Sequence, residues 1–264
     1  MTGGTASSRA VAAIVPCKDE ADRIAATVTA VLGLEGVDRV VVVDDGSSDD
    51  TAAVAHAAGA DVVVHARNAG KAAALETGVR HLRQLEAAEG AIPDTDPRTP
   101  RHLLFVDGDL EASAGNLGVL VPPVLEGRAD MTIATLPPQK VAGGGHGFVV
   151  RLARDGIERL TGWTPVQPLS GMRCLTAEAF DAATPLARGW GVEVGLTVDV
   201  HSAGLRVEEV PCELHHRVSG RDWRGQVHRA KQYRDVWRAL TRRRIRRRLQ
   251  RVLPERARGV AHRG

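Results

Sequence analysis

Two carboxylates one residue apart follow an apolar segment near the middle of the chain. They are Asp107 and Asp109, separated by Gly108 and preceded by His102–Val106. The glycine permits a tight turn, so both carboxylates can reach one hard cation such as Mg²⁺ or Mn²⁺. Such a cation bridges phosphate oxygens and neutralises charge on a departing diphosphate. The pattern therefore predicts a metal-assisted phosphate site, with a solvated acidic turn as the alternative.

A second acidic pair ends a run of valines. Val41–Val43 is followed directly by Asp44 and Asp45. A carboxylate at the end of a strand can accept a hydrogen bond from a ribose hydroxyl or a base N–H, so the pair predicts nucleotide binding. The nearby Asp49 and Asp50 are candidates for a helix N-cap instead.

A lysine stands at the predicted start of a helix. Lys71 follows Asn68, Ala69 and Gly70. The first turn of a helix already favours an anion, and a lysine there adds a full positive charge. Lys71 is therefore a candidate phosphate ligand, and an ordinary surface lysine is the alternative.

The elements that must position these residues alternate between strand and helix. The strands are predicted at Ala10–Val15, Arg39–Val43, Asp61–Val64 and His102–Val106, and the helices at Ile24–Leu32, 51–58 and Gly70–Arg83. This alternation predicts an α/β fold with a mostly parallel sheet sandwiched by helices. Because ligands bind beyond the carboxyl ends of parallel strands, the three polar segments should meet at one edge of the sheet.

The second half of the chain is less regular. Its predicted helices are Asn116–Leu125 (interrupted by two prolines), Phe148–Leu160, Val192–Ala203 and Trp223–Leu240, and its strands are Asp130–Thr135, the end of Gln167–Cys174, and Arg206–Val210. Ala87–Pro100 and Gly143–Gly147 are predicted loops. We expect one catalytic domain over residues 1–240, with a donor half at about 10–112 and an acceptor half at about 113–240.

Charge is unevenly distributed along the chain. Nine arginines and one glutamate lie between Arg242 and Arg258, although the whole chain has a net charge of only +3. The body is therefore mildly acidic and residues 241–264 form a basic tail, expected to be disordered or a membrane-surface helix. Contact through 241–258 with an anionic membrane is one interpretation, a solvated terminus is the other, and we expect no nucleic-acid partner.

The cysteines and the hydropathy pattern bear on the compartment. Cys17, Cys174 and Cys212 are far apart and form no CxxC pair, so we expect neither a disulfide framework nor a zinc site. We also expect no signal peptide and no membrane span, because no apolar stretch reaches the required length. These features favour a cytoplasmic protein, with a peripheral position at the inner membrane face and a homodimer as further alternatives.

Taken together, the motifs resemble the nucleotide-binding half of family 2 glycosyltransferases with the GT-A fold. The resemblance rests on Pro16–Glu20, Val43–Ser47, Asn68–Lys71 and Asp107–Asp109. It implies a nucleotide-sugar donor and a bound Mg²⁺ or Mn²⁺, with Asp109 as a metal ligand. The donor-binding residues that it implies are Pro16, Cys17, Lys18, Glu20, Asp44, Asp45, Lys71, Asp107 and Gly108.

The second half resembles the glucosyl-3-phosphoglycerate synthase family. The matching segments are Gln167–Gly171, Gly189–Leu196 and His215–Arg217. The resemblance implies that Glu193 lies by the transferred sugar as a catalytic residue beside Asp109. It implies that His216 completes the metal site, and the adjacent His215 is the competing ligand. The implied reaction is transfer of glucose from UDP-glucose to a small phosphorylated or carboxylated acceptor such as 3-phosphoglycerate, with retention of configuration.

Polyprenyl-phosphate sugar transferases provide a second resemblance. It rests on Ser170–Arg173, and on Glu209–Pro211 with Arg217–Gly220. It implies an acceptor site made of Ser170, Gly171, Arg173 and Arg217, in which the arginines meet a lipid phosphate by planar bidentate contact. The basic tail would then lie on the membrane surface.

Two further functions remain as alternatives. A nucleotidyltransferase is disfavoured, because that class opens with a glycine-rich loop after its first strand and Pro16–Glu20 contains no glycine. A nucleotide-sugar-binding protein without turnover would carry the same donor-site residues, and only an assay for nucleotide release separates it from an enzyme.

Overall fold

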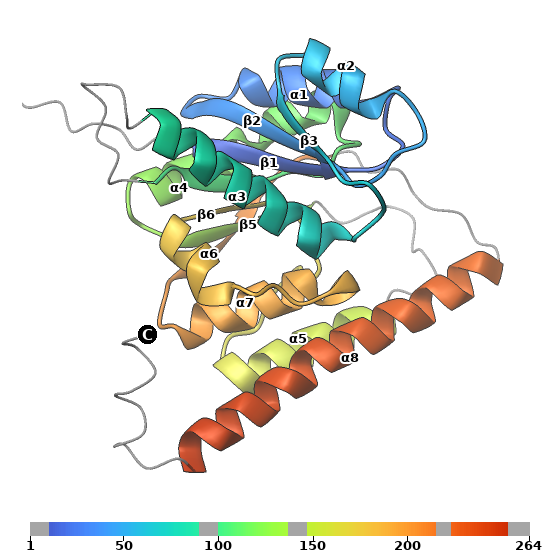
Figure 1. Cartoon of the computed structure of the whole chain (residues 1–264). Coiled ribbons are helices and arrows are strands. Elements are labelled where there is room, and N and C mark those ends of the chain that lie inside the picture. Colours follow the sequence, from blue (N-terminus) through green and yellow to red (C-terminus); the bar gives the residue numbers. More distant parts are fainter. Residues whose placement is uncertain (1–10, 90–99, 137–146, 215–222, 253–264) are drawn as a thin grey trace, which may run out of the picture.

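The computed structural model describes residues 11–89, 100–136, 147–214 and 223–252. One sheet contains the strands β1 (Val11–Cys17), β2 (Val37–Asp44), β3 (Asp61–Val64), β4 (His102–Phe105), β5 (Met131–Thr135), β6 (Arg173–Leu175) and β7 (Val207–Pro211). The α-helices are α1 (Ile24–Leu32), α2 (Thr51–Ala57), α3 (Lys71–Glu89), α4 (Val121–Leu125), α5 (Gly147–Thr161), α6 (Ala177–Ala183), α7 (Val192–Ser202) and α8 (Trp223–Val252) (Figure 1). Two 3₁₀ helices are η1 (Glu111–Leu120) and η2 (Gly189–Gly191).

The strand order in the sheet is β3-β2-β1-β4-β6-β5-β7. All pairs are parallel except the two that involve β6, which runs antiparallel to β4 and to β5. The predicted mostly parallel α/β fold is thereby confirmed. Because β1 pairs in parallel with both β2 and β4, the carboxyl ends of these three strands meet at one edge.

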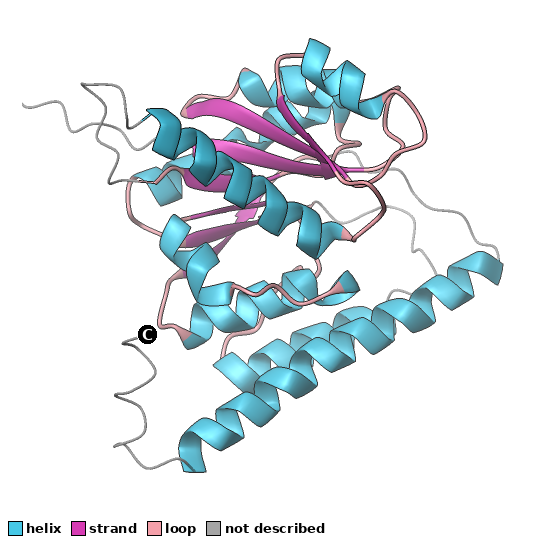
Figure 2. Ribbon diagram, in the orientation of Figure 1, coloured by secondary structure: helices cyan, strands magenta, loops and turns pink. Residues whose placement is uncertain are grey.

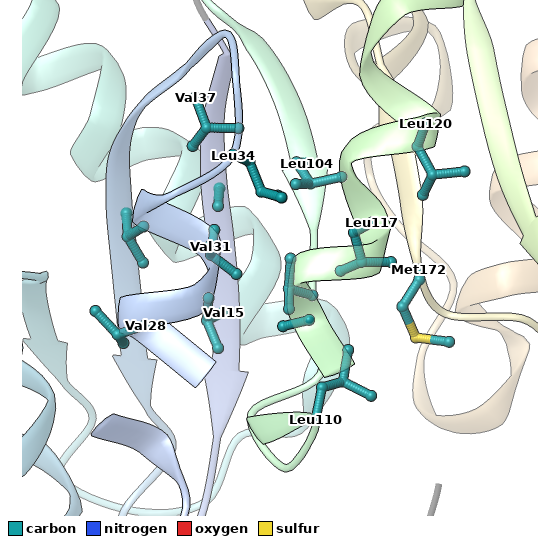
Figure 3. Packing of buried hydrophobic residues seen from close by; sticks show 14 of the residues in the cluster. Val15, Val28, Val31, Leu34, Val37, Leu104, Leu110, Leu117, Leu120 and Met172 are labelled. Atoms are coloured by element: carbon teal, nitrogen blue, oxygen red, sulfur yellow. The ribbon is translucent and has the colours of Figure 1, made fainter. Parts of the chain in front are cut away.

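Both faces of the sheet are covered by helices (Figure 2). Alternate residues of β1 point to opposite faces, as the two-residue period of a strand requires. Val15 packs toward α1 and η1, where Val31 and Leu117 belong to the same buried cluster (Figure 3). Ile14 belongs to the opposite cluster with Leu75 of α3. Burial on both faces explains why the strands are apolar without alternation.

Helix α8 adds a further layer outside the sheet. It runs beside α5 and contacts α7 (Figure 1). A third buried cluster joins these helices and includes Ile157, Val198, Val236 and Leu240. None of the helices in the described ranges is both long enough and apolar enough to span a membrane.

Several boundaries differ from the sequence-based expectation. The helix predicted at Asn116–Leu125 is the 3₁₀ helix η1 up to Leu120 and the α-helix α4 from Val121. Pro122 and Pro123 lie in the first turn of α4, where the missing N–H of a proline costs no hydrogen bond. Helix α3 continues past Arg83 to its last residue, Glu89, which pairs with Arg101 at 3.1 Å. Helix α8 continues past Leu240 through residues predicted as tail, because Arg243 pairs with Asp199 of α7 and Arg247 donates to the Leu160 carbonyl. Helix α6 was not predicted, although its N-cap Thr176 accepts from the Ala179 amide at 3.0 Å.

Candidate active site

A pocket of about 590 Å³ opens at the shared edge of β1, β2 and β4. Its size lies within the range of small-molecule sites, roughly 300–1,000 Å³. Most of the predicted donor residues line it, together with five residues that were not assigned a role. The lining is Pro16, Cys17, Lys18, Glu20, Asp45, Asn68, Gly70, Lys71, Ala74, Asp107, Gly108, Asp109, Gly189, Trp190 and Glu193.

The acidic turn after β4 is held by a buried threonine of α1. The hydroxyl of Thr27 donates to the Gly108 carbonyl at 2.9 Å and accepts from the Glu111 amide at 2.8 Å. Both partners are more than 80 residues away in sequence, and nothing in the local pattern singles Thr27 out. This residue fixes the direction in which Asp107 and Asp109 leave the strand.

Lys71 lies between two carboxylates. Its Nζ is 2.8 Å from Oδ1 of Asp107 and 3.2 Å from Oε1 of Glu193. Burial alone lowers the pKa of Lys71, but the attraction of the two carboxylates outweighs it and raises the pKa above its ordinary value. Lys71 is therefore charged, and it joins three distant elements: the start of α3, the end of β4 and the first turn of α7.

Gly171 borders this cluster. A Cβ atom at Gly171 would lie 2.5 Å from Nζ of Lys71 and 3.4 Å from the Asp107 carboxylate. The main chain before β6 thus passes directly against the Lys71–Asp107 pair, and only a residue without a side chain fits there without moving the lysine.

Asp109 and Glu20 form the more open acidic part of the pocket. Asp109 makes no ion pair or hydrogen bond within the described residues, whereas Glu20 pairs with Arg23 at 2.5 Å. Burial raises the pKa of Glu20; Arg23 opposes this rise and the negative charge of Asp109 adds to it. The two carboxylates therefore repel each other, which a cation beside Asp109 would relieve.

The described residues contain no group of three or more His, Cys, Asp or Glu side chains that could hold a metal ion. Mg²⁺ is commonly held by one or two carboxylates together with substrate phosphates and water, so the single unpaired carboxylate of Asp109 fits this kind of site. His215 and His216 lie outside the described residues, so the prediction that His216 is a ligand stays a prediction.

The acidic pair after β2 serves mainly to hold the main chain. Asp45 accepts from the amides of Ala69 and Gly70, both at 2.7 Å, and lies 2.8 Å from Nδ1 of His65. Burial raises its pKa, but these hydrogen bonds outweigh burial and lower it. Asp45 therefore fixes the loop that precedes Lys71.

Asp44 does not line the pocket. It is buried, and its Oδ1 accepts from the Ser47 amide at 2.8 Å. Cys17 does line the pocket, but burial, with Asp44 next in effect, raises the pKa of its thiol to about 12. The thiol is therefore neutral, and Cys17 contributes shape rather than charge.

The structure places the predicted acceptor residues in different surroundings. Gly171 lies at the pocket, but Arg173 is buried in the sheet with 1% of its surface exposed. Its Nε donates to the Ser170 carbonyl at 2.9 Å and its Nη1 to Oγ1 of Thr197 at 2.8 Å. Burial lowers the pKa of Arg173 to about 10. Arg173 is thus not placed where a lipid phosphate could reach it, and Arg217 lies outside the described residues.

Comparison with known proteins agrees with this geometry. The model of the glycosyl transferase family 2 domain matches residues 12–147. The chain is 31% identical over 220 residues to glycosyltransferase AglJ of Haloferax volcanii, covering 81% of this chain and 65% of that protein. It is 32% identical over 216 residues to glucosyl-3-phosphoglycerate synthase of Mycolicibacterium paratuberculosis, covering 73% and 60%. The chain thus spans a little under two thirds of the length of these two relatives.

A solved structure extends the similarity to the whole fold. The crystal structure of glucosyl-3-phosphoglycerate synthase from Mycobacterium tuberculosis, in complex with Mn²⁺, UDP and phosphoglyceric acid, superposes with a TM-score of 0.67. Sequence identity is 26%, over 89% of this chain and 78% of that one. The architecture is therefore the GT-A fold, and the chain belongs to glycosyl transferase family 2.

Proposed function

We propose that the chain transfers a sugar from a nucleotide-sugar donor to a small phosphorylated or carboxylated acceptor. Glucose from UDP-glucose, and 3-phosphoglycerate, are the first candidates, because a relative is named for the glucosyl-3-phosphoglycerate product and a solved structure of that enzyme contains UDP-glucose and phosphoglyceric acid. The observation that carries the proposal is Lys71, a charged lysine held between Asp107 and Glu193 at the carboxyl edge of the sheet.

Lys71 supplies the positive charge for the donor diphosphate. In the reaction the bond between the anomeric carbon and the β-phosphate oxygen breaks, the bond to the acceptor oxygen forms, and the acceptor hydroxyl loses its proton. Negative charge then grows on the leaving UDP, where a fixed ammonium group stabilises it. Pro16, Lys18 and Glu20 line the same pocket, and we propose that they contact the nucleoside.

Asp109 would hold Mg²⁺ or Mn²⁺, with His216 as the proposed second protein ligand. Such an ion, when bound, neutralises diphosphate charge. Asp107 has a different task, because its Oδ1 is already engaged by Lys71.

Glu193 is proposed to bind the sugar rather than to remove a proton. Its carboxylate is buried, and its Oε1 is already engaged by Nζ of Lys71 at 3.2 Å. The remaining acceptor capacity of the carboxylate suits a sugar hydroxyl. Retention of the anomeric configuration is part of the proposal and is read from the anomeric coupling in the product NMR spectrum.

The test is a donor screen that measures nucleotide release with Mn²⁺, with 3-phosphoglycerate and a polyprenyl phosphate as alternative acceptors. UDP release that depends on UDP-glucose and 3-phosphoglycerate supports the proposal. Release only with the polyprenyl phosphate identifies the lipid-linked alternative. Tight donor binding without release under any acceptor contradicts enzymatic transfer and identifies a binding protein.

A further inference from the structure

A second hollow lies between α8 and the segment that joins α6 to α7. Its volume is about 630 Å³, and none of its lining residues lines the active-site pocket. Five arginines surround it: Arg188, Arg238, Arg242, Arg243 and Arg246. An adjoining hollow of about 370 Å³ shares Arg243 and Arg246 and adds Arg247.

The two carboxylates of this hollow are already neutralised. Asp199 accepts from Nε of Arg243 at 3.0 Å, and both side chains are almost fully buried. Asp235 pairs at 3.0 Å with Arg234, which does not line the hollow. Neither acid is therefore left to balance the remaining arginines.

Those remaining arginines have no counter-charge of their own. Arg188, Arg238 and Arg242 make no ion pair or hydrogen bond within the described residues, and Arg246 has only a longer-range attraction to Asp199. Several guanidinium groups around one concave surface repel each other, and a multivalent anion removes that repulsion. Guanidinium groups match phosphate oxygens by paired hydrogen bonds.

The adjoining hollow offers one more unsatisfied polar group. His201 lines it, and Nε2 of His201 is buried without a hydrogen-bond partner in the described structure. Burial lowers the pKa of His201, so the ring is neutral and can donate or accept one hydrogen bond. Its ring lies against Trp163, with 4.8 Å between centroids, which fixes its orientation.

Helix α8 packs closely on the segment before α7. A Cβ atom at Gly191 would lie 2.8 Å from Cβ of Ala239 and 3.0 Å from the Asp235 carbonyl oxygen. Val236 and Leu240 of α8 belong to the same buried cluster as Val198 of α7. The arginines therefore project from a helix whose position is fixed by packing, which lowers the entropic cost of binding an anion.

We propose that this hollow is a second binding site, for a phosphate-class anion with the charge of a diphosphate. The phosphate group can belong to a soluble metabolite or to a lipid headgroup, and both present the same chemistry to the arginines. The site is separate from the donor pocket, and the proposal does not depend on the sugar transfer proposed above.

The test is calorimetric titration of the full chain with inorganic pyrophosphate in the presence of a chelator, which removes any contribution of a metal at Asp109. In R242A/R246A we expect a loss of affinity of about tenfold or more, equivalent to about 1.4 kcal/mol. Arg244 and Arg248 line neither hollow, so R244A/R248A, which removes the same charge from the same helix, is the matched control and should bind like wild type. K71M separates the two sites, because it removes any pyrophosphate that binds in the donor pocket; the binding that is sensitive to R242A/R246A should remain in K71M.

Flotation with phosphatidylcholine vesicles, with and without phosphatidylglycerol, distinguishes the two sources of phosphate. Flotation that needs phosphatidylglycerol and is lost only in R242A/R246A identifies a lipid headgroup, whereas pyrophosphate binding without flotation identifies a soluble ligand. Absence of both activities in the wild type overturns the proposal. Equal losses in the two double variants, or a loss in K71M instead, also overturn it. Thermal melting by circular dichroism checks that each variant is folded.

Discussion

The active-site pocket and the arginine-lined hollow beside α8 differ in whether their cations are paired with carboxylates. In the pocket, Lys71 is held between Asp107 and Glu193 before any ligand arrives. In the hollow, the two acids are already paired, and Arg188, Arg238 and Arg242 have no ion-pair partner among the residues that the structure describes. A cation with fixed partners is held in one position, which suits chemistry at a defined atom. Unpaired arginines on a helix surface suit binding that needs affinity more than exact placement.

Removing the charge of Lys71 from the active-site pocket should have the largest effect. Lys71→Met should lower kcat/KM for sugar transfer by about 10²–10³-fold, the usual effect of losing one electrostatic contact to a developing charge. Steady-state nucleotide release measures it. Lys231→Met is the matched control, because Lys231 is exposed on α8. Activity within a factor of about two of wild type in Lys71→Met would remove Lys71 from the proposed mechanism.

Removing one of the two carboxylates beside Lys71 leaves the lysine less fully paired, as the arginines of the hollow are. Glu193→Gln should reduce kcat about tenfold or more, because a sugar contact is weakened. It should also retain or tighten UDP binding, since Lys71 then has one competing carboxylate fewer. Calorimetry with UDP and turnover assays separate the two effects. Weaker UDP binding together with an unchanged kcat would contradict this assignment.

A smaller disturbance displaces the lysine without removing it. Gly171→Ala places a methyl group at 2.5 Å from Nζ of Lys71, so the ammonium group must move. We expect KM for the donor to rise several-fold, by about 1 kcal/mol, with the fold intact. Gly115→Ala is the control, because nothing lies within 4 Å of a Cβ atom at Gly115. Equal donor KM values for the two variants would argue against contact between this segment and the donor site.

The last expected change concerns the loop that precedes Lys71, and it appears in stability rather than in turnover. Asp45→Asn should lower the free energy of unfolding by about 2 kcal/mol at neutral pH, because hydrogen bonds to a charged acceptor are lost. The folded pKa of Asp45 is lowered, so its stabilising effect is present above the unfolded value near 3.8 and disappears as pH falls through the folded pKa.

The measurement for this last prediction is urea unfolding of both proteins at neutral pH and in the acid range. The difference between wild type and Asp45→Asn should shrink on acidification. A difference that stays constant at all pH values would show that the carboxylate charge of Asp45 is not what holds the loop.

The sequence was most informative where local pattern decides structure. The bounds of Ile24–Leu32 and Asp61–Val64 were predicted as the structure has them, because apolar periodicity and valine runs report burial directly. The convergence of the acidic turns with Lys71 followed from parallel topology alone.

What the sequence did not reveal depends on long-range pairing. Strand β6 inserts antiparallel between β4 and β5, and this insertion buries Arg173, which was predicted to bind the acceptor phosphate. Thr27 supports a turn 81 residues away. Asp44 seemed equivalent to Asp45, but only Asp45 reaches the pocket. These contacts cannot be predicted from the periodicity or the composition of the sequence.

The arrangement of Lys71 has one consequence for how a donor enters. Lys71 already has two anionic neighbours in the empty pocket, and a donor diphosphate must compete with them. In the proposed mechanism, the donor diphosphate then competes with Asp107 and Glu193 for the ammonium group of Lys71. The carboxylate oxygens that do not face Lys71 stay available to the sugar. In the empty pocket, the positive charge of Lys71 is therefore already balanced by carboxylates of the protein.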